Sequence, residues 1–404
     1  MGCAAARSGP ERAKRTVSAD FSNLQGFCKG VPPLSRDDHA GHVERLQARL
    51  RKTGVGALVV EPGPTMFHLS GVQWWPSERA FFMVVPNEGP PWWVCPAFEA
   101  ERAAERAGAK ADLRLWQEHE DPFALVAKGL DAKPVAVDPG FRAFMGERLA
   151  SAIERPLRSG RKLVRDVRII KGPRELALLD RANQATKAAL AAVSQRTHVG
   201  MRESELRRLI ADAQRAAGLT RIWSLVLFGP NAAFPHGSGK ERVLADGDFI
   251  LVDTGGQLHG YCSDITRTWS VGPVPDDARR AFDIVLKAQR KAFEVIGPGV
   301  PCSQVDAAAR AVIDASGFGS GYEVFTHRLG HGIGLQGHED PYLVQGNDLV
   351  LQPGMTMSNE PGIYVSGRFG VRIEDILAIT EDGHRVFGPM VPSFETPVPS
   401  VPAA

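Results

Sequence analysis

The C-terminal half of this 404-residue chain places acidic and imidazole side chains inside apolar, strand-like segments. Acidic side chains are rarely buried in a folded protein unless they are paired or bound to a metal. This pattern constrains the fold more than any other feature, because the buried charges require compensation. The segments are Phe234-Pro-His236, Leu251-Val-Asp253-Thr-Gly-Gly, Cys262-Ser-Asp264-Ile-Thr-Arg, His327-Arg-Leu-Gly-His331-Gly-Ile-Gly-Leu-Gln-Gly-His338, Ser358-Asn-Glu360-Pro and Val371-Arg372-Ile-Glu374-Asp.

Two aspartates are predicted to share one face of a hairpin. Asp253 ends an apolar run, Asp264 opens the run Ile-Thr-Arg-Thr-Trp, and glycines lie between them. If the turn is centred near Leu258-His259, the two aspartates are cross-strand neighbours with Cβ atoms about 5 Å apart. Two carboxylates at that distance repel each other unless a cation lies between them. Two solvated aspartates at loop ends are the alternative interpretation.

The histidine-rich segment is predicted to be extended. His327 and His331 are four residues apart, which on a helix would form a zinc-binding face, but Gly330, Gly332 and Gly334 each cost a helix about 1 kcal/mol. A glycine-rich strand and turn fits better, because glycine lets backbone and substrate approach closely. Packing histidines without a ligand role are the alternative.

The last two acidic segments also favour extended structure. Glu360 precedes Pro361, which disfavours helical geometry at Glu360. Arg372 and Glu374 are two residues apart in a strand pattern, so they should share a face. A salt bridge between Arg372 and a carboxylate is the simpler interpretation of that strand, and both interpretations can hold together.

A charge count indicates what could compensate these groups. Asp253, Asp264, Glu360 and Glu374 contribute four negative charges, and His331 adds a neutral nitrogen ligand. Two divalent cations would balance them, whereas one would leave a costly negative cluster. Carboxylate-rich ligation favours Mn²⁺, with Co²⁺ and Zn²⁺ as alternatives. A pair of such ions can activate water and polarise a carbonyl, which is the chemistry of hydrolysis.

The order Asp, Asp, His, Glu, Glu with glycine-rich flanks resembles that of the "pita-bread" dinuclear metallopeptidases, which include methionine aminopeptidase, aminopeptidase P and prolidase. The resemblance spans about residues 230–380 and is specific to the Xaa-Pro branch, the prolidases and Xaa-Pro aminopeptidases. It implies an α+β catalytic domain with a curved antiparallel sheet, preceded by a smaller α/β domain. The matching motifs are Val252-Asp253-Thr-Gly-Gly, Ser263-Asp264-Ile-Thr-Arg-Thr, Gly330-His331-Gly-Ile-Gly, Glu360-Pro-Gly-Ile-Tyr364 and Arg372-Ile-Glu374-Asp.

The resemblance implies a role for each ligand position. Asp253 would chelate one metal, and Asp264 and Glu374 would bridge both. His331 and Glu360 would complete the second site. Glu360 would also act as the general base that takes a proton from water and passes it to the leaving nitrogen.

The resemblance also implies roles around the metals. His236 and His338 match the pair that hydrogen-bonds the substrate and its tetrahedral intermediate, and both are therefore expected to be catalytic. His327 matches a histidine on the proline side of the pocket. Arg372 would orient the bridging carboxylates. Tyr364 stands where it could line the cleft, without an assigned role.

The resulting prediction is an enzyme that hydrolyses the Xaa-Pro bond of short peptides, as a dipeptidase or an aminopeptidase. The segment between Glu360 and Glu374 is short, as in the compact prokaryotic prolidases that it resembles, and this resemblance favours dipeptides. One alternative is a non-peptidase on the same scaffold, namely creatinase-like C–N hydrolysis, ectoine-derivative hydrolysis or dimethylsulfoniopropionate cleavage. A non-enzymatic binding module is another. Creatinase-type enzymes and non-enzymatic relatives lose metal ligands, whereas all five positions are filled here.

The rest of the chain predicts the domain organisation. Residues 1–33 are polar and unpatterned, so a poorly ordered tail is expected. Alternating strand and helix patterns predict an α/β domain over residues 34–165. A linker is expected near residues 158–172, and the catalytic domain is expected over residues 166–395.

Composition narrows the partners and the compartment. The 48 basic and 46 acidic residues give a net charge of +2, which argues against nucleic acid as a partner. No run approaches the roughly 18 apolar residues of a membrane span, and the basic N-terminus lacks the apolar region of a secretory signal. Five cysteines without a CxxC pair favour the reducing cytoplasm. Short proline-containing peptides are the expected substrates, and the family resemblance suggests a homodimer.

Overall fold

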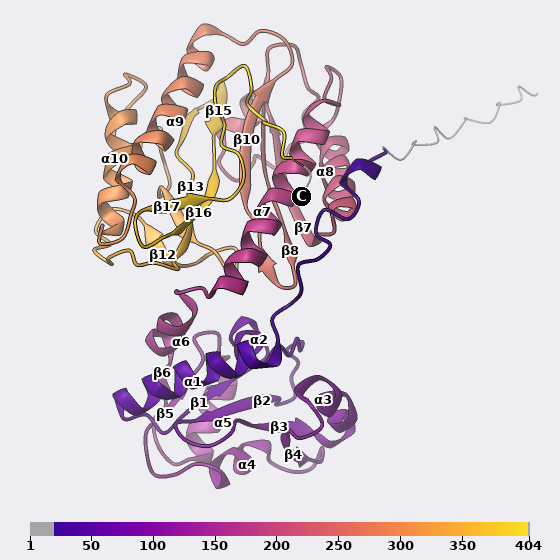
Figure 1. The fold of residues 1–404 in the computed structure, drawn as a ribbon, viewed down its shortest axis with the longest axis vertical. Helices are drawn as coiled ribbons and strands as arrows, with labels where there is room; N and C mark the ends of the chain where they lie inside the picture. Colours follow the sequence, from indigo (N-terminus) through magenta and orange to yellow (C-terminus); the bar gives the residue numbers. More distant parts are fainter. Residues whose placement is uncertain (1–19, 403–404) are drawn as a thin grey trace, which may run out of the picture.

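The computed structural model describes residues 20–402, which form two domains of different size (Figure 1). The N-terminal domain, at the bottom of the view, is one sheet with helices on both faces. The larger domain, at the top, places its helices beside several antiparallel strands. No helix in this range combines the length and apolarity needed to cross a membrane.

The N-terminal domain has the strand order β4-β3-β2-β1-β5-β6. Its elements are α1 (Arg36–Thr53), β1 (Ala57–Val60), α2 (Pro64–Ser70), β2 (Phe82–Pro86), β3 (Trp92–Pro96), η2 (Ala97–Glu99), α3 (Ala100–Ala107), β4 (Asp112–Trp116), α4 (Pro122–Lys128), β5 (Val135–Val137), α5 (Ala143–Ala152), β6 (Arg158–Ser159) and α6 (Arg161–Arg168). Side chains of β1 alternate between two layers: Leu58 packs with α1, α2 and α6, and Val59 packs with α4 and α5. The predicted α/β N-terminal domain is confirmed.

Within residues 20–402, the larger, C-terminal domain contains four long helices and three antiparallel sheets, with orders β10-β8-β7, β12-β11-β13-β16-β17 and β14-β15. Its elements are α7 (Pro173–Ser194), α8 (Glu203–Ala217), β7 (Thr220–Phe228), η3 (Gly229–Ala233), β8 (Phe249–Leu258), β9 (Tyr261–Cys262), β10 (Ile265–Ser270), α9 (Asp276–Val295), α10 (Cys302–Asp314), β11 (Gly330–Gly332), β12 (Glu339–Leu343), β13 (Thr356–Asn359), β14 (Gly362–Val365), β15 (Phe369–Arg372), β16 (Asp375–Ile379) and β17 (His384–Val386). Helices and antiparallel strands thus combine as the α+β prediction required.

Strand β8 shows how the sheet separates the core from the site. Val252 belongs to the apolar cluster that also contains residues of α7 and α8. The next residue, Asp253, points to the opposite face because side chains alternate along a strand, and there it lines a pocket. The helices therefore cover one face of the strands, and the other face is free to carry polar chemistry.

Residues 20–33 contradict the predicted tail, whose first part, residues 1–19, lies outside the described residues. This segment, which includes η1 (Ser22–Leu24), runs beside α8 (Figure 1). Phe21, Leu24 and Cys28 are buried in the catalytic-domain core, and the Cys28 amide donates to the Ala217 carbonyl at 3.1 Å. Phe27 and Val31 are partly buried against the same core, so apolar side chains anchor this segment.

Two further expectations need correction. Residues 158–172 are not an open linker, because they hold β6 and the helix α6, whose Leu163, Val164 and Val167 are buried against the N-terminal domain. Arg372 and Glu374 do not lie in one strand, because β15 ends at Arg372 and β16 begins at Asp375 in a different sheet. The chain changes sheets there, which local patterning cannot reveal.

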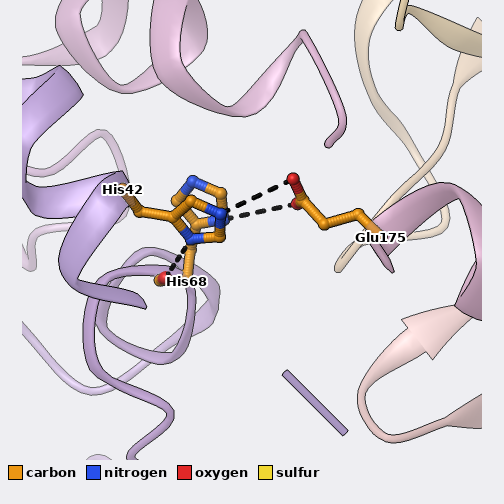
Figure 2. A group of neighbouring side chains, drawn as sticks. All are labelled: His42, His68 and Glu175. Carbon is orange, nitrogen blue, oxygen red and sulfur yellow. Dashed lines mark hydrogen bonds and ion pairs between the residues drawn. The ribbon is translucent and has the colours of Figure 1, made fainter. Parts of the chain in front are cut away.

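A buried cluster of two histidines and one glutamate joins the domains (Figure 2). The rings of His42 on α1 and His68 on α2 stack with centroids 3.8 Å apart and an interplanar angle of 9°. Glu175 of α7 faces both, with Oε2 3.6 Å from His42 Nε2 and Oε1 3.8 Å from His68 Nδ1. Parallel rings cannot direct their in-plane lone pairs at one ion, so this cluster is a polar contact between domains rather than a metal site.

Candidate metal centre

A pocket of about 580 Å³ gathers nine of the ten predicted site residues. The exception is Tyr364, which lies behind the pocket wall. The lining residues are Trp223, Leu225, Pro235, His236, Asp253, Asp264, His327, Arg328, His331, His338, Glu360, Arg372 and Glu374. Trp223, Leu225, Pro235 and Arg328 were not predicted. Arg328 stands inside the histidine-rich segment, which is a signal that could have identified it.

The hairpin that carries the two aspartates has a different register from the predicted one. Leu258 pairs with Tyr261, so the turn residues are His259 and Gly260, with φ of 48° and 89°. Asp253 therefore pairs with Thr266 and lies diagonally from Asp264 rather than directly opposite. The turn shifts because a two-residue hairpin favours positive φ at both central positions. An offset of two residues keeps both aspartates on one face, as predicted.

His331 presents a bare nitrogen to two carboxylates. Its Nδ1 lies 3.1 Å from the carbonyl oxygen of Gly332, which can only accept, so Nδ1 carries the proton of a neutral ring. Its Nε2 then faces Glu360 Oε1 at 3.2 Å and Asp264 Oδ2 at 3.7 Å. The lone pairs of His331, Glu360 and Asp264 therefore face one another, and a cation between them would stabilise this arrangement.

Close backbone approach explains the glycines beside His331. A Cβ at Gly330 would lie 2.0 Å from the carbonyl oxygen of Ser358, and one at Gly332 would lie 2.3 Å from that of Asp340. The predicted extended, glycine-rich strand is therefore confirmed in β11. The absence of side chains lets β11 pack tightly between β12 and β13.

Three carboxylate oxygens in the pocket lack a protein partner within residues 20–402: Asp253 Oδ1, Asp264 Oδ1 and Glu374 Oε1. Burial and the neighbouring carboxylates raise the pKa of Asp264 and of Glu374 well above their ordinary values. Both shifts measure how costly these negative charges are without compensation. The donor set therefore fits divalent cations, which would supply the compensation that the protein does not.

The donor atoms in the pocket form three overlapping groups; two of them share Glu374, and the third joins Asp264, His331 and His338. Asp253, Asp264 and Glu374 bring ligand atoms within 4.8 Å of one another, and His331, Glu360 and Glu374 do the same. Asp264 also lies close to His331, so both acids stand between the two groups. These residues would hold divalent cations, which would supply activation of water and polarisation of a carbonyl.

Glu360 remains ionised despite its burial. Burial alone would raise the pKa of Glu360, but the neighbouring His331, His327 and Arg372 outweigh burial and lower that pKa to about 2. The Ser358 hydroxyl donates to Glu360 Oε1 at 3.1 Å. Oε2 lies 4.0 Å from Arg372 Nε. Oε1 is therefore held by a hydrogen bond, whereas Oε2 is less constrained in the pocket.

Arg372 contacts a different carboxylate from the ones predicted. Its Nη2 donates to Asp253 Oδ2 at 2.7 Å, and its Nε donates to Thr266 Oγ1 at 3.1 Å. The Thr266 hydroxyl in turn donates to Glu374 Oε2 at 2.8 Å. Arg372 thus orients Asp253 directly and reaches the bridging candidate Glu374 only through Thr266.

Tyr364 connects Arg372 to His327. Arg372 Nη1 donates to the Tyr364 hydroxyl at 2.9 Å, and that hydroxyl lies 2.7 Å from His327 Nε2. His327 Nδ1 lies 2.8 Å from the Arg328 carbonyl, so Nε2 accepts from the tyrosine. Burial lowers the pKa of His327 to about 4, which keeps this ring neutral. Tyr364 therefore holds the wall of the cleft rather than lining it.

The two predicted catalytic histidines both reach the pocket from exposed positions. His236 follows η3. His338 packs against His331 with ring centroids 3.8 Å apart and ring planes tilted by 33°, and its Nδ1 accepts a hydrogen bond from Arg328 Nη2 at 3.1 Å. Because Nδ1 accepts, the proton of His338 lies on Nε2, where the ring can donate to a bound molecule.

The larger domain combines helices, antiparallel sheets and a pocket of acidic and histidine side chains that suits metal ions. These features define the class of the protein as a metal-dependent hydrolase. The chain belongs to metallopeptidase family M24, which matches residues 177–381, and residues 42–170 match the creatinase/prolidase N-terminal domain. The pita-bread fold expected from the sequence is thereby confirmed.

Similar proteins cover nearly the whole chain. The probable dipeptidase PepE of Mycobacterium tuberculosis is 40% identical over 351 residues, which cover 85% of this chain and 93% of that protein. The crystal structure of dipeptidase PepE from Mycobacterium ulcerans has a TM-score of 0.84 at 35% identity, covering 88% and 97% of the two chains. A prolidase from Thermococcus sibiricus has a TM-score of 0.80 at 28% identity, covering 89% and 98%.

Proposed function

We propose that this hydrolase cleaves the Xaa-Pro bond of short peptides, dipeptides foremost, with two divalent cations of which Mn²⁺ is the favoured identity. One observation carries the proposal: two overlapping groups of ligand atoms, sharing Glu374, line a single pocket with three further histidines. The cations, when bound, supply activation of water and polarisation of the scissile carbonyl. The similarity to a prolidase supports the same substrate class.

The side chains of the protein bind the cations, transfer the proton and stabilise the developing charge. Asp253, Asp264, Glu374, His331 and Glu360 hold the cations. Glu360 also accepts a proton from the attacking water and returns it to the leaving nitrogen, because its ionised carboxylate faces the site. His338, with its proton on Nε2, and His236 donate to the developing negative charge on the carbonyl oxygen.

The pocket walls suit a proline residue. Trp223, Leu225 and Pro235 provide apolar surface, and the neutral His327 adds an uncharged ring. A prolyl nitrogen has no hydrogen to donate, so a peptidase that grips the scissile N–H loses a contact with this bond. A centre that instead binds the free amine and the carbonyl loses nothing, which explains how this site can accept Xaa-Pro.

The proposal is tested with Gly-Pro, Ala-Pro, Ala-Pro-Ala and Ala-Ala as substrates. The protein is first treated with EDTA and then supplied with Mn²⁺, Co²⁺ or Zn²⁺. Hydrolysis of the Xaa-Pro dipeptides should disappear with EDTA, return best with Mn²⁺, and exceed hydrolysis of Ala-Ala. Preference for Ala-Ala would refute the Xaa-Pro assignment, and faster cleavage of Ala-Pro-Ala than Ala-Pro would refute the dipeptide assignment.

A further inference from the structure

The two glutamates of the candidate metal centre lie in a gap between two strand pairs. Strands β13 and β16 pair as far as Asn359 and Asp375, and β14 and β15 continue the same register beyond the gap. This register places Glu360 opposite Glu374 inside the gap. The glutamates therefore occupy the positions of cross-strand neighbours where the ladder of hydrogen bonds is interrupted.

The interruption has a cause in the sequence. The Ile379 amide donates to the Met355 carbonyl at 2.8 Å, and hydrogen-bonded pairs recur at every second position of an antiparallel ladder. The same register assigns the first bond beyond Asn359 to Pro361 and Ile373. Because proline has no amide hydrogen, the Ile373 carbonyl needs a donor from another part of the chain.

Gln289 of α9 supplies that donor from behind the strands. Its side chain is buried, and its Nε2 donates to the carbonyl oxygens of Asn359 and Ile373, each at 3.3 Å, and to Asp375 Oδ2 at 3.1 Å. Asn359 Nδ2 donates in return to the Gln289 carbonyl at 3.0 Å. One buried amide thus contacts the residue before each glutamate.

The orientation of the Gln289 amide is set by Asp375. Lys187 Nζ lies 2.6 Å from Asp375 Oδ1, and Arg267 Nη2 donates to the same oxygen at 2.7 Å. Both cationic side chains are buried, so the carboxylate between them has a fixed position. Since a carboxylate accepts hydrogen bonds and cannot donate them, Nε2 of Gln289 must face Asp375.

The backbone amides of the two glutamates bond to other segments. The Glu360 amide donates to the Leu329 carbonyl at 2.9 Å, and the Glu374 amide donates to the Thr266 carbonyl at 3.1 Å. The ladder therefore does not set the separation of the two carboxylates. We propose, as an extension that rests on the proposed function, that Gln289 is a positioning residue that sets this separation and thereby the affinity for the cation held by His331, Glu360 and Glu374.

The experiment compares Mn²⁺ binding by Gln289→Met and by the wild type. Methionine has a similar length but no donor, so the two carbonyls lose their partner. After EDTA treatment and removal of EDTA, free Mn²⁺ is followed by electron paramagnetic resonance during a titration, which gives a dissociation constant for each bound ion. One constant should rise by about 10- to 100-fold, as expected when a partner behind the ligands is removed. The other should rise less, because only one of its carboxylates is affected.

Activity provides a second readout. A protein that has lost only the positioning of its ligands should need more Mn²⁺ for half-maximal hydrolysis of Ala-Pro, and excess Mn²⁺ should restore most of kcat. A general packing defect would instead lower the active fraction at every Mn²⁺ concentration. The response to Mn²⁺ therefore separates positioning from packing.

Two further variants serve as controls. Val285→Ala removes a buried apolar side chain one turn earlier on the same face of α9. It should lower the melting temperature without changing either Mn²⁺ constant. Gln289→Asn keeps the amide on a shorter side chain and should give an intermediate change, so it tests the proposal even if Gln289→Met does not fold.

Three outcomes would overturn the proposal: unchanged Mn²⁺ constants in Gln289→Met, unchanged constants in Gln289→Asn if only that variant folds, or an equal rise in Val285→Ala. A wild type that binds no Mn²⁺ would overturn both this proposal and the metal-dependent function. Cleavage of Ala-Ala but not Ala-Pro would refute the proposed substrate class alone, because Mn²⁺ binding tests Gln289 independently of the substrate.

Discussion

His42 Nε2 in the N-terminal domain lies 3.6 Å from Glu175 Oε2 in the catalytic domain, and both side chains are buried. Glu175 also accepts from the Gly172 amide and the Tyr261 hydroxyl, each at 2.8 Å. These hydrogen bonds fix the position of the Glu175 carboxylate at the contact between the two domains. Because Glu175 is a titratable group, the stability of this contact should depend on pH.

The first prediction concerns the pH dependence of stability. Burial opposes ionisation of Glu175, but the hydrogen bond with His42 and the charges of both histidines lower its pKa from 4.5 to about 2. Because the folded-state pKa is depressed, the stabilisation is complete above pH ~4.5 and is lost as pH falls toward 2. Glu175→Gln should therefore lower the free energy of unfolding by on the order of 2–3 kcal/mol at pH 7, and the difference from wild type should vanish near pH 2–3.

Urea unfolding at several pH values measures this difference. Glu44→Gln changes an exposed glutamate on α1, the helix that carries His42, and is the control that should follow the wild type throughout. A constant difference between Glu175→Gln and wild type at all pH values would show that Glu175 acts through packing alone.

Metal removal is expected to affect both activity and stability. Four carboxylates converge in the pocket, so cations that bind only the folded state should raise the melting temperature, and EDTA should lower it. Elemental analysis should find up to two divalent ions per chain, and Mn²⁺ should restore activity. A folded, active protein that needs no metal would contradict the candidate centre.

Replacing Glu360 with Gln should abolish most turnover without unfolding the protein. The change removes a proton acceptor and weakens a ligand, so the loss should exceed the roughly 10²–10⁴-fold attributed to general-base catalysis alone. Glu381→Gln, at an exposed position, serves as the control. Near-normal turnover of the Glu360→Gln variant would mean that Glu360 is only structural.

His236→Ala and His338→Ala should each lower turnover by about 10²–10³-fold, as the loss of an oxyanion-type donor does. Metal content should stay nearly constant in both variants. His338 is the sharper test, because its ring lies within ligand distance of Asp264 and His331. If metal were lost together with activity, His338 would be a ligand, and if only the melting temperature fell, the histidines would serve packing.

The hairpin that carries the two aspartates should not tolerate a side chain at Gly255. A Cβ there would lie 1.9 Å from the Ser263 carbonyl oxygen, so β8 and the segment before β10 would have to separate. Gly255→Ala should cost about 1–3 kcal/mol or more and reduce metal affinity, because Asp253 and Asp264 flank the clash. Gly383→Ala, where a Cβ meets nothing within 4 Å, is the control. Unchanged metal binding would mean that the hairpin does not set the site.

The sequence by itself determined the composition of the candidate site and the kind of backbone that carries it. The hairpin of the two aspartates and the extended segment around His331 were predicted, because glycine content and apolar runs are local properties. Nine of the ten predicted residues line one pocket, since buried acids and imidazoles cannot be tolerated singly and must be placed together.

Only the tertiary structure decided how these residues face one another. The hairpin register depended on positive φ at His259 and Gly260, and the partner of Arg372 depended on which strand packed beside it. The contact between His42 and Glu175 joins residues that are far apart in the chain. A local sequence pattern predicts which residue lies on which face of a strand. The register of paired strands, the hydrogen-bond partners of a side chain and its exposure depend on contacts between distant segments, which a short stretch of sequence does not contain.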